Sequence, residues 1–504
     1  MAYSLLLVFI LPALGVPFVY LAGKKSSRAA AFLVALIAIA NMALLFTTVP
    51  AIFSSPRHEY VEPYEWITIL DSKFTLFVDG ISVSLAIITT VLIVVAALFS
   101  VNYMEGKKNL AVYYSLLTLL SLGLVGVFIT SNLLLFYFCW ELMLVPAYFI
   151  IGNWGYRDSY RAAFKFFIFT HAGAVFVLLG IGAIYMVTGT TDMFVAQAAL
   201  VQNLPEIVPW ILISLTAGFA VKMAVVPVHM WLPDAHSEAP SPMSALLSGV
   251  IISAGAYAIL RLSLGAVFPA VAGTTFGIDF MHGLAIFGVI SAFFGSLIAL
   301  VETDIKRIIA YSSIAHMGYV MFGLSLFPST PIVGALTITA AITGTVLHLV
   351  NHAVSKGLLF LSAGAIMHQT ETRDIREMGG LAGKMPFTAV ASFTSALSIA
   401  GTPPFACFIS EFLIFVGAFE VINNDSFFLW PTAFMLIATV ISLAYSLRFL
   451  SHVFLGKAKP EGEKKIVDVP IYMKVAMGVL VIFVVVLGFW PTFFVDLINT
   501  VQFL

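Results

Sequence analysis

Charged residues are scarce in this chain of 504 residues. Asp, Glu, Lys and Arg make up 10% of it and hydrophobic residues make up 61%, whereas a soluble domain carries about 25% charged residues. The deficit extends along the whole chain, and no polar stretch is long enough to form a soluble domain. We therefore expect lipid, rather than water, to be its main solvent.

Cysteine is also nearly absent. Cys139 and Cys407 lie apart in apolar runs, and neither belongs to a CxxC motif. An iron–sulfur cluster, a zinc site or a disulfide scaffold is therefore not expected, and we predict no metal or cofactor in this chain. The net charge of -1 gives no reason to expect nucleic-acid binding. The apolar N-terminus lacks a small-residue cleavage site, so we interpret it as a first span.

The hydrophobic segments predict an all-α integral membrane protein with about 14 transmembrane helices, since one crossing needs about 20 apolar residues. The candidate spans run near 3–22, 29–49, 79–103, 111–130, 132–152, 164–187, 209–229, 242–262, 277–300, 307–327, 332–367, 386–420, 430–454 and 470–494. The eleventh and twelfth are too long for one straight crossing, so they must tilt, project or break.

Basic residues predict the orientation. Most Lys and Arg gather in loops that follow odd-numbered spans, and only Arg57 and Lys73 lie in loops that follow even-numbered ones. Because cytoplasmic loops are enriched in basic residues, we predict a multi-pass protein of the cytoplasmic membrane with both termini outside.

A few ionisable residues lie deep inside the predicted spans. They are Glu141, Glu411, Lys222 and Lys356. Charges at this depth are costly and mark ion pathways or proton relays. Lys222 is the expected partner of Glu141, and a static ion pair that only locks two helices is the alternative. Arg261 lies near a span end, where it can extend toward the interface.

Two spans contain proline at the point where they carry a deep charge. Lys222 precedes Pro227 and Pro233, and Glu411 follows the break at 402–404 by about two helical turns. Broken helices often form ion sites in membrane proteins. Because two spans combine a break with a buried charge, the prediction of an ion site at each is stronger than it would be for one alone.

The eleventh span carries a stripe of titratable residues. His348, His352 and Lys356 are four residues apart and share one helix face. Histidine titrates near neutral pH and suits proton transfer. His316 in the tenth span can extend this line or, equally, make a core hydrogen bond.

Haem ligation is a rival interpretation of the histidines. His348 and His352 share one face and cannot both ligate one iron. His171 or His229 could supply the second ligand, although no spacing requires it.

Four segments resemble one known family. FAVKMAVVPVHMWLPDAHSEAP, ETDIKRIIAYSSIAHMGYV, HLVNHAVSKGLLFLSAGAI and the Trp140-Glu141-Leu142 segment are similar to the antiporter-like subunits of complex I, of Mrp antiporters, and of membrane-bound hydrogenases and sulfane sulfur reductases. The resemblance covers nearly the whole chain. Glutamate at position 411 points to the NuoM-like and Mrp D-like branch.

The resemblance implies a domain plan. Helices 1–3 occupy 1–110, a first inverted five-helix repeat occupies 111–265, a second occupies 266–456, and a last helix lies in 457–504. Each repeat would contain one broken helix. These repeats follow from the family and not from the residues alone.

The resemblance also implies a proton path. Protons would enter from the cytoplasm near Glu141 and Lys222 and leave by Glu411. The residues assigned to the relay are Glu141, Lys222, His316, His348, His352, Lys356 and Glu411.

One position departs from the family pattern. Ser253 stands where many complex I members have a lysine in the eighth helix. This favours a hydrogenase-type or sulfur reductase-type complex over ordinary complex I.

The resemblance implies partners and leaves other functions open. Other antiporter-like subunits, small hydrophobic subunits and a peripheral redox arm with iron–sulfur, flavin or NiFe centres would accompany the chain. An Mrp-type Na+/H+ antiporter subunit is the alternative function. A structural membrane anchor is the third.

Overall fold

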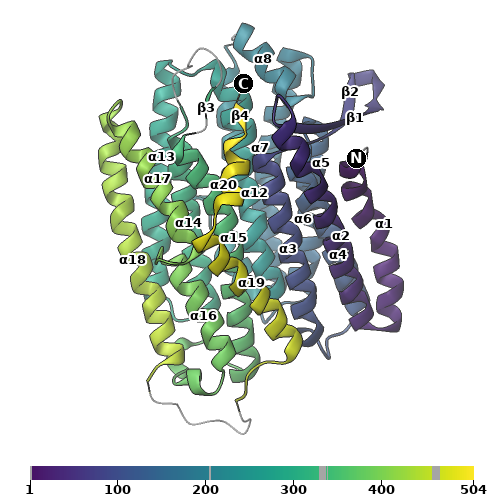
Figure 1. The fold of residues 1–504 in the computed structure, drawn as a ribbon, viewed down its shortest axis with the longest axis vertical. Coiled ribbons are helices and arrows are strands. Elements are labelled where there is room, and N and C mark those ends of the chain that lie inside the picture. The colour runs from purple at the N-terminus through teal and green to yellow at the C-terminus, as the bar shows by residue number, and fades with distance from the viewer. Residues whose placement is uncertain (1–2, 204–205, 329–335, 338, 457–465, 504) are drawn as a thin grey trace.

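The computed structural model describes residues 3–203, 206–328, 336–337, 339–456 and 466–503. Within these ranges the chain is almost entirely helical, and most helices run side by side along one axis (Figure 1). Twelve helices are long and apolar enough to cross a membrane. The predicted all-α, multi-pass architecture is confirmed.

The first half of the chain contains one strand pair and the first broken helix. Its long elements are α1 (Ser4–Lys25), α2 (Ser27–Ser54), β1 (Glu59–Ile67), β2 (Ser72–Asp79), α3 (Gly80–Tyr103), α4 (Leu110–Phe128), α5 (Leu133–Leu142), α6 (Leu144–Trp154), α7 (Ser159–Thr188), α8 (Met193–Asn203), α9 (Val208–Met223), α10 (Leu232–Glu238), α11 (Ser241–Leu246), η2 (Leu247–Ile251), α12 (Ile252–Ala258) and η3 (Ile259–Val267). The antiparallel pair β1–β2 accounts for the predicted polar stretch near 54–73.

The second half contains the second broken helix. Its long elements are α13 (Thr275–Val301), α14 (Ile305–Ser325), β3 (Leu336–Thr337), α15 (Ala340–Thr370), α16 (Pro386–Ile399), α17 (Ala406–Ile422), α18 (Leu429–Phe454), α19 (Ile471–Phe489), α20 (Thr492–Asn499) and β4 (Gln502–Phe503). Parts of the predicted span 332–367 and of the polar stretch 456–468 lie outside the described residues.

Each of the fourteen predicted spans contains a described helix. The helix of the seventh, α9, ends at Met223 before Pro227, and helix resumes as α10 beyond the predicted span. The twelfth is divided into α16 and α17 around Pro403 and Pro404, and the fifth is interrupted between α5 and α6. The eleventh is a single helix, α15, of 31 residues. Both labelled termini lie at the same end of the molecule (Figure 1), as an even number of crossings requires.

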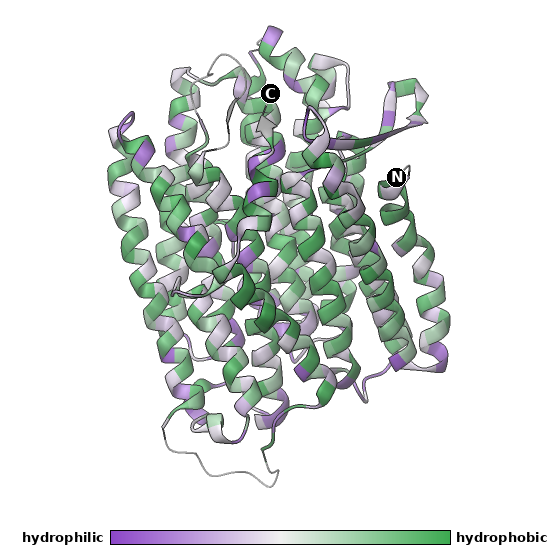
Figure 2. Cartoon of the chain, in the orientation of Figure 1, coloured by the Kyte–Doolittle hydropathy of each residue, from purple (hydrophilic) through white to green (hydrophobic). Residues whose placement is uncertain are grey.

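Burial separates an inner group of helices from an outer group. In α15 and in 241–270 the whole apolar window is buried inside the protein, whereas only about a third of it is buried in α1, α18 and α19. Hydrophobic residues dominate the middle of the helices, and hydrophilic ones concentrate toward their ends (Figure 2). The inner helices α14 and α15 are also the least apolar of the twelve. The polar residues inside the membrane are therefore shielded by protein.

Candidate functional site

Glu141 is the last residue but one of α5, a helix that Asn132 caps by accepting from the amides of Leu134 and Leu135. Its Oε2 lies 3.2 Å from Nδ1 of His171 on α7. Its Oε1 is buried and has no hydrogen-bond partner among the described residues. Only one of the two carboxylate oxygens of Glu141 is thus bonded within the described residues.

Lys222 lies in the last turn of α9, just before the break. Its Nζ donates to the carbonyl of Trp140 at 3.0 Å and lies 4.0 Å from the centre of the Trp140 ring. No ion pair shorter than 4.0 Å joins it to Glu141 in the part of the chain that the structure describes. Lys222 still interacts electrostatically with Glu141, as the predicted partnership requires, but it does so without a direct ion pair and contacts the adjacent Trp140.

The break after Lys222 is closed by a side chain. Met223 ends α9, Ala224 adopts a left-handed conformation (φ 61°), and α10 starts at Leu232. The indole Nε1 of buried Trp231 donates to the carbonyl of Val221 at 2.8 Å. This bond satisfies a carbonyl that the interrupted helix leaves without its usual partner.

Lys356 lies near the middle of α15 and is fully buried. Its Nζ donates to the hydroxyl of Ser312 and to the carbonyl of Ile309 on α14, the latter at 3.4 Å. Like Lys222, it is bonded to neutral acceptors.

Two predicted histidines meet across α14 and α15. Nδ1 of His316 lies 3.2 Å from Nε2 of His348, and the two rings are stacked with their centres 5.3 Å apart. His348 continues through its Nδ1 to the Ser410 hydroxyl at 3.0 Å, and His316 through its Nε2 to the Tyr445 hydroxyl at 3.4 Å. These bonds form a continuous polar line from α14 to α17 and α18.

His352 is placed beside this line but is not bonded to it. Its ring centre lies 5.6 Å from that of His316 and 6.2 Å from that of His348. The residue is fully buried, and neither ring nitrogen has a hydrogen-bond partner among the described residues.

Glu411, on α17, lies beside His316 in this group of polar residues. Its Oε1 lies 3.9 Å from Nδ1 of His316, and the residue is buried. Gly401, in the break between α16 and α17, has a φ of +63°, and a Cβ built on it would lie 2.4 Å from Oε2 of Glu411. Only glycine lets the backbone approach the carboxylate this closely without strain.

The donor set of His316, His348 and Glu411 has the spacing of a metal site, because one ligand atom from each lies within 4.8 Å of the others. His316 and His348 bond each other, His348 also bonds Ser410, and Oε1 of Glu411 lies 3.9 Å from Nδ1 of His316.

Ser253 lies between the two groups of charges and is buried on α12. Its hydroxyl donates to the carbonyl of Gly249 at 2.9 Å, inside its own helix. The π-helical segments η2 and η3 flank α12, and such segments are common at functional sites. Ser248 on η2 contacts Ser313 on α14 at 2.9 Å, which links this helix to the second half by hydroxyl groups.

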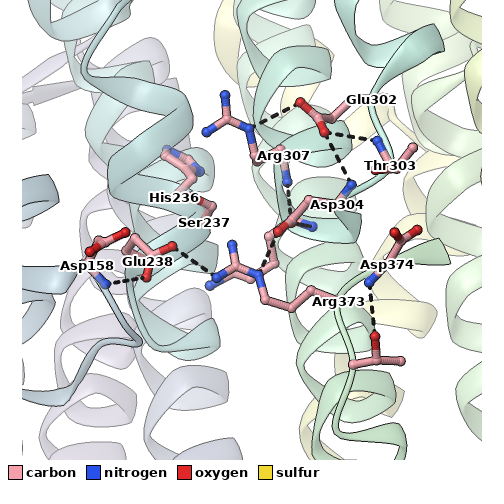
Figure 3. A network of polar contacts seen from close by, with 12 residues as sticks. Asp158, His236, Ser237, Glu238, Glu302, Thr303, Asp304, Arg307, Arg373 and Asp374 are labelled. Atoms are coloured by element: carbon pink, nitrogen blue, oxygen red, sulfur yellow. Dashed lines mark hydrogen bonds and ion pairs between the residues drawn. The ribbon is translucent and has the colours of Figure 1, made fainter. Parts of the chain in front are cut away.

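A polar cavity of about 880 Å³ opens at the end of the molecule that carries the loops after odd-numbered spans. Arg373 lies beside it and bridges Glu238 at 3.0 Å and Asp304 at 2.7 Å, while Arg307 bonds Glu302 at 3.1 Å (Figure 3). Burial opposes the charge of Arg373, but the Asp304 and Glu238 carboxylates outweigh it and raise its pKa. The network ties the end of α10 to the start of α14.

Sequence reasoning missed three polar groups near these sites. Lys306, which we assigned to a loop, is fully buried and donates to the carbonyl of Ala239. His236 is fully buried in α10, and neither of its ring nitrogens has a partner among the described residues. Arg261, expected to extend toward the interface, is instead buried and paired with Asp79 at 2.6 Å. The LPDAH motif was a signal for His236, whereas nothing in the sequence separated Lys306 from its exposed neighbours.

A family model described as "NADH:quinone oxidoreductase/Mrp antiporter, TM" matches residues 130–442. NADH-quinone oxidoreductase subunit M of Rhodobacter capsulatus is 34% identical over 457 residues, which are 88% of this chain and 84% of that protein. A chain of the sulfane sulfur reductase of an archaeal respiratory membrane complex is 27% identical with a TM-score of 0.83, over 97% of this chain and 76% of the other. A chain of respiratory complex I from Thermus thermophilus, 23% identical over 98% and 97%, has the same fold with a TM-score of 0.83.

Proposed function

Because this chain belongs to the NADH:quinone oxidoreductase/Mrp antiporter transmembrane family, we propose that it translocates protons as one membrane subunit of a redox-driven complex. The observation that carries the proposal is a buried cluster of titratable side chains. His316 and His348 bond each other, Oε1 of Glu411 lies 3.9 Å from Nδ1 of His316, and Lys356 bonds Ser312 on the helix that carries His316. A bilayer-embedded protein retains such groups for ion movement.

Each half of the chain supplies one broken helix, one lysine and one carboxylate. Lys222 lies at the first break and Glu141 on the neighbouring α5, whereas Glu411 lies after the second break and Lys356 on α15. The predicted repeats 111–265 and 266–456 give each half one such set. The lysines bond neutral acceptors, so each can release a proton without leaving an unpaired anion in direct contact.

The polar cavity lies at the end of the molecule that carries the loops after odd-numbered spans. It offers protons a way to the buried histidines and Lys356. Glu238 borders this cavity, and buried His236 lies two residues before it on α10. Protons enter near Glu141 and Lys222, and His236 and His352 offer a second route from the cavity that joins this path at Lys356. The proton then passes to His348 and His316 and leaves by Glu411. This path agrees with the predicted orientation, in which the cavity faces the cytoplasm and both termini lie outside.

The partners expected for such a subunit are other antiporter-like and small hydrophobic membrane subunits and a peripheral redox arm. The relatives come from NADH-quinone oxidoreductase and from an archaeal sulfane sulfur reductase complex. Any iron–sulfur, flavin or NiFe centres would belong to the arm. Ser253 favours the hydrogenase-type or sulfur reductase-type arm over that of ordinary complex I.

The test uses the native complex in sealed vesicles. Glu141→Gln should abolish proton translocation coupled to redox turnover, whereas Glu105→Gln, at a carboxylate that is 65% exposed, should leave it unchanged. An unaltered proton-to-electron ratio in Glu141→Gln rejects the proposal. Copurification without any redox subunit would instead support the Mrp-type antiporter.

A further inference from the structure

The last two helices, α19 and α20, lie between the two halves of the chain. Together they contact α3 of the first half and α15, α16 and α17 of the second, and the C-terminal segment runs across the front of the bundle (Figure 1). Of these helices, α17 carries Glu411 and α15 carries His348 and Lys356. The end of the chain therefore touches both of these helices of the second buried cluster.

Gly488, in the last turn of α19, meets the backbone of the second break. A Cβ built on Gly488 would overlap the carbonyl oxygen of Pro404 and would lie 2.9 Å from the carbonyl carbon of Phe405. Both contacts are with backbone atoms, which cannot rotate away as the end of a flexible side chain can. A side chain at position 488 would therefore push α19 and the break apart.

The break would transmit such a displacement to Glu411. Gly401, three residues before Pro404, leaves no room for a Cβ on the side that faces the Glu411 carboxylate. The backbone from Gly401 to Pro404 is thus packed against this carboxylate at one end and against α19 at the other. Because close-packed groups shift together rather than compress, the position of α19 determines where the carboxylate lies relative to His316.

Contacts away from the break hold α20 in place. The hydroxyl of Thr343, in the first turn of α15, donates to Oδ1 of Asn499 at 2.7 Å. Gly80, the first residue of α3, leaves no room for a Cβ beside the carbonyl of Leu497. The end of the chain is therefore attached to each half of the protein independently of its contact with Pro404.

We propose that α19 and α20 position the Glu411 carboxylate relative to His316, and that Gly488 is the positioning residue. Its lack of a side chain seats α19 on the Pro404 carbonyl, and the bond between Thr343 and Asn499 fixes this arrangement to α15. The inference rests on the proposed function and adds to it a residue that exchanges no proton itself. Neither the family match nor the relatives assign a role to Gly488.

The first test measures Gly488→Ala in the native complex in sealed vesicles. The proton-to-electron ratio should fall severalfold in the assembled complex, and the pH of half-maximal translocation should shift, because the carboxylate then titrates in changed surroundings. A merely structural role would lower the yield of complex and leave this pH profile unchanged. The titratable groups that surround the carboxylate are His316 and Tyr319 on α14, His348 on α15, Tyr445 on α18 and Cys407 on α17.

Gly478→Ala is the matched control for this test. Gly478 lies on the same helix, and the nearest atom to its Cβ position belongs to the ring of Phe387 at 3.5 Å, an ordinary contact. This variant should change neither the ratio nor the pH profile. Equal losses in Gly478→Ala and Gly488→Ala would overturn the inference.

The second test adds no bulk at the break. Thr343→Val removes the bond to Asn499, so the complex should assemble, with a smaller fall in the ratio and a smaller pH shift than in Gly488→Ala. Thr345→Val, on the same helix, is its control, since the Thr345 hydroxyl bonds the carbonyl of Ala341 in its own helix.

Glu411→Gln separates this inference from the proposed function. A full ratio and an unchanged pH profile in Gly488→Ala, together with a loss in Glu411→Gln, overturn the positioning role and leave the proposed function intact. If Gly488→Ala does not assemble, a full ratio and an unchanged profile in Thr343→Val overturn the positioning role in the same way. A full ratio in Glu411→Gln overturns the proposed function itself.

Discussion

The three buried lysines are all bonded to neutral groups. Lys222 donates to a carbonyl, Lys306 donates to another, and Lys356 donates to a hydroxyl and a carbonyl. Arg261 differs, since its guanidinium lies 2.6 Å from the buried carboxylate of Asp79. Removal of a lysine therefore leaves no bonded anion behind, whereas removal of Arg261 does.

This difference predicts opposite outcomes for two substitutions. Lys356→Met should stop proton translocation while the subunit still assembles, because only neutral acceptors lose a donor. Arg261→Met should destabilise the protein by about 3–5 kcal/mol, the usual cost of an uncompensated buried charge. Thermal unfolding and assembled yield measure both effects.

The Arg261→Met prediction can be checked with a second substitution in the same ion pair. Addition of Asp79→Asn to Arg261→Met should recover most of the lost stability, because the buried negative charge is then gone. An Arg261→Met protein as stable as the parent would contradict the buried ion pair. Loss of assembly in Lys356→Met would instead support the structural-anchor hypothesis.

Gly401 gives a second prediction at the scale of one residue. Gly401→Ala should displace the Glu411 carboxylate, because the new Cβ would lie 2.4 Å from Oε2, and we expect proton translocation to fall about tenfold or more. Gly456→Ala is the matched control, since Gly456 also has a positive φ but nothing lies within 4 Å of its Cβ position. Both alanine variants cost about 1–2 kcal/mol, because an L residue is strained at a positive φ. Equal translocation by the two variants would therefore contradict a specific effect on the Glu411 carboxylate.

At the scale of elements, the two broken helices are held by side chains of other segments. Trp231 bonds the carbonyl of Val221 across the first break. At the second, the Ser398 hydroxyl accepts from the amide of Cys407 at 3.3 Å, and Asn351 on α15 donates to the carbonyl of Ala406 at 2.7 Å. These bonds tie the backbone on one side of each break to a side chain, so the breaks are fixed parts of the fold.

The first break can be tested by removal of its indole bond. Trp231→Phe keeps most of the ring but removes the indole bond, so the Val221 carbonyl retains only the Ala224 amide at 3.2 Å, and this loss should cost about 0.5–1.5 kcal/mol. Trp210→Phe, at a tryptophan that is 70% exposed, should change stability far less. The measurement is the midpoint of thermal unfolding in detergent, and equal midpoints would show that the bond contributes nothing.

Much of the element plan could be predicted from the sequence because lipid sets the length of each span and proline sets each break. The segments 209–229 and 386–420 were correctly expected to break. The contacts of Glu141 could not be predicted in the same way. Which face of α7 meets α5 depends on how the helices pack, so the sequence favoured Lys222, whereas the structure has His171 beside it.

At the scale of the whole molecule, ion pairs beside the polar cavity join the first half of the chain to the second. Arg373 connects Glu238 on α10 with Asp304 just before α14 (Figure 3), so it links the first broken helix to the second half of the chain. Arg373 was expected in a loop, and it lies in the loop between α15 and α16. Sequence analysis could not identify the bridge, because the three partners are far apart in the chain.

The bridge predicts unequal effects for two arginines in one loop. Arg373→Ala removes charge-assisted bonds from partly buried carboxylates and should cost about 2–3 kcal/mol of stability. Arg376→Ala removes only a pair with Asp374 in which the arginine is 66% exposed, so it should cost much less, because water screens an exposed ion pair. Thermal unfolding of both variants compares them, and a larger loss in Arg376→Ala would contradict the bridge.

The burial of α14 and α15 bears on how the chain enters the membrane. Their mean hydropathy of 1.3 is the lowest of the twelve apolar helices, whereas α3 reaches 2.7. Lys356 and the histidines of α15 add a further penalty for insertion as an isolated segment. The more apolar helices can partition into lipid singly during synthesis, but α14 and α15 need protein neighbours to accept them. The proton-carrying centre of the molecule would thus be the part whose insertion depends most on the rest of the chain.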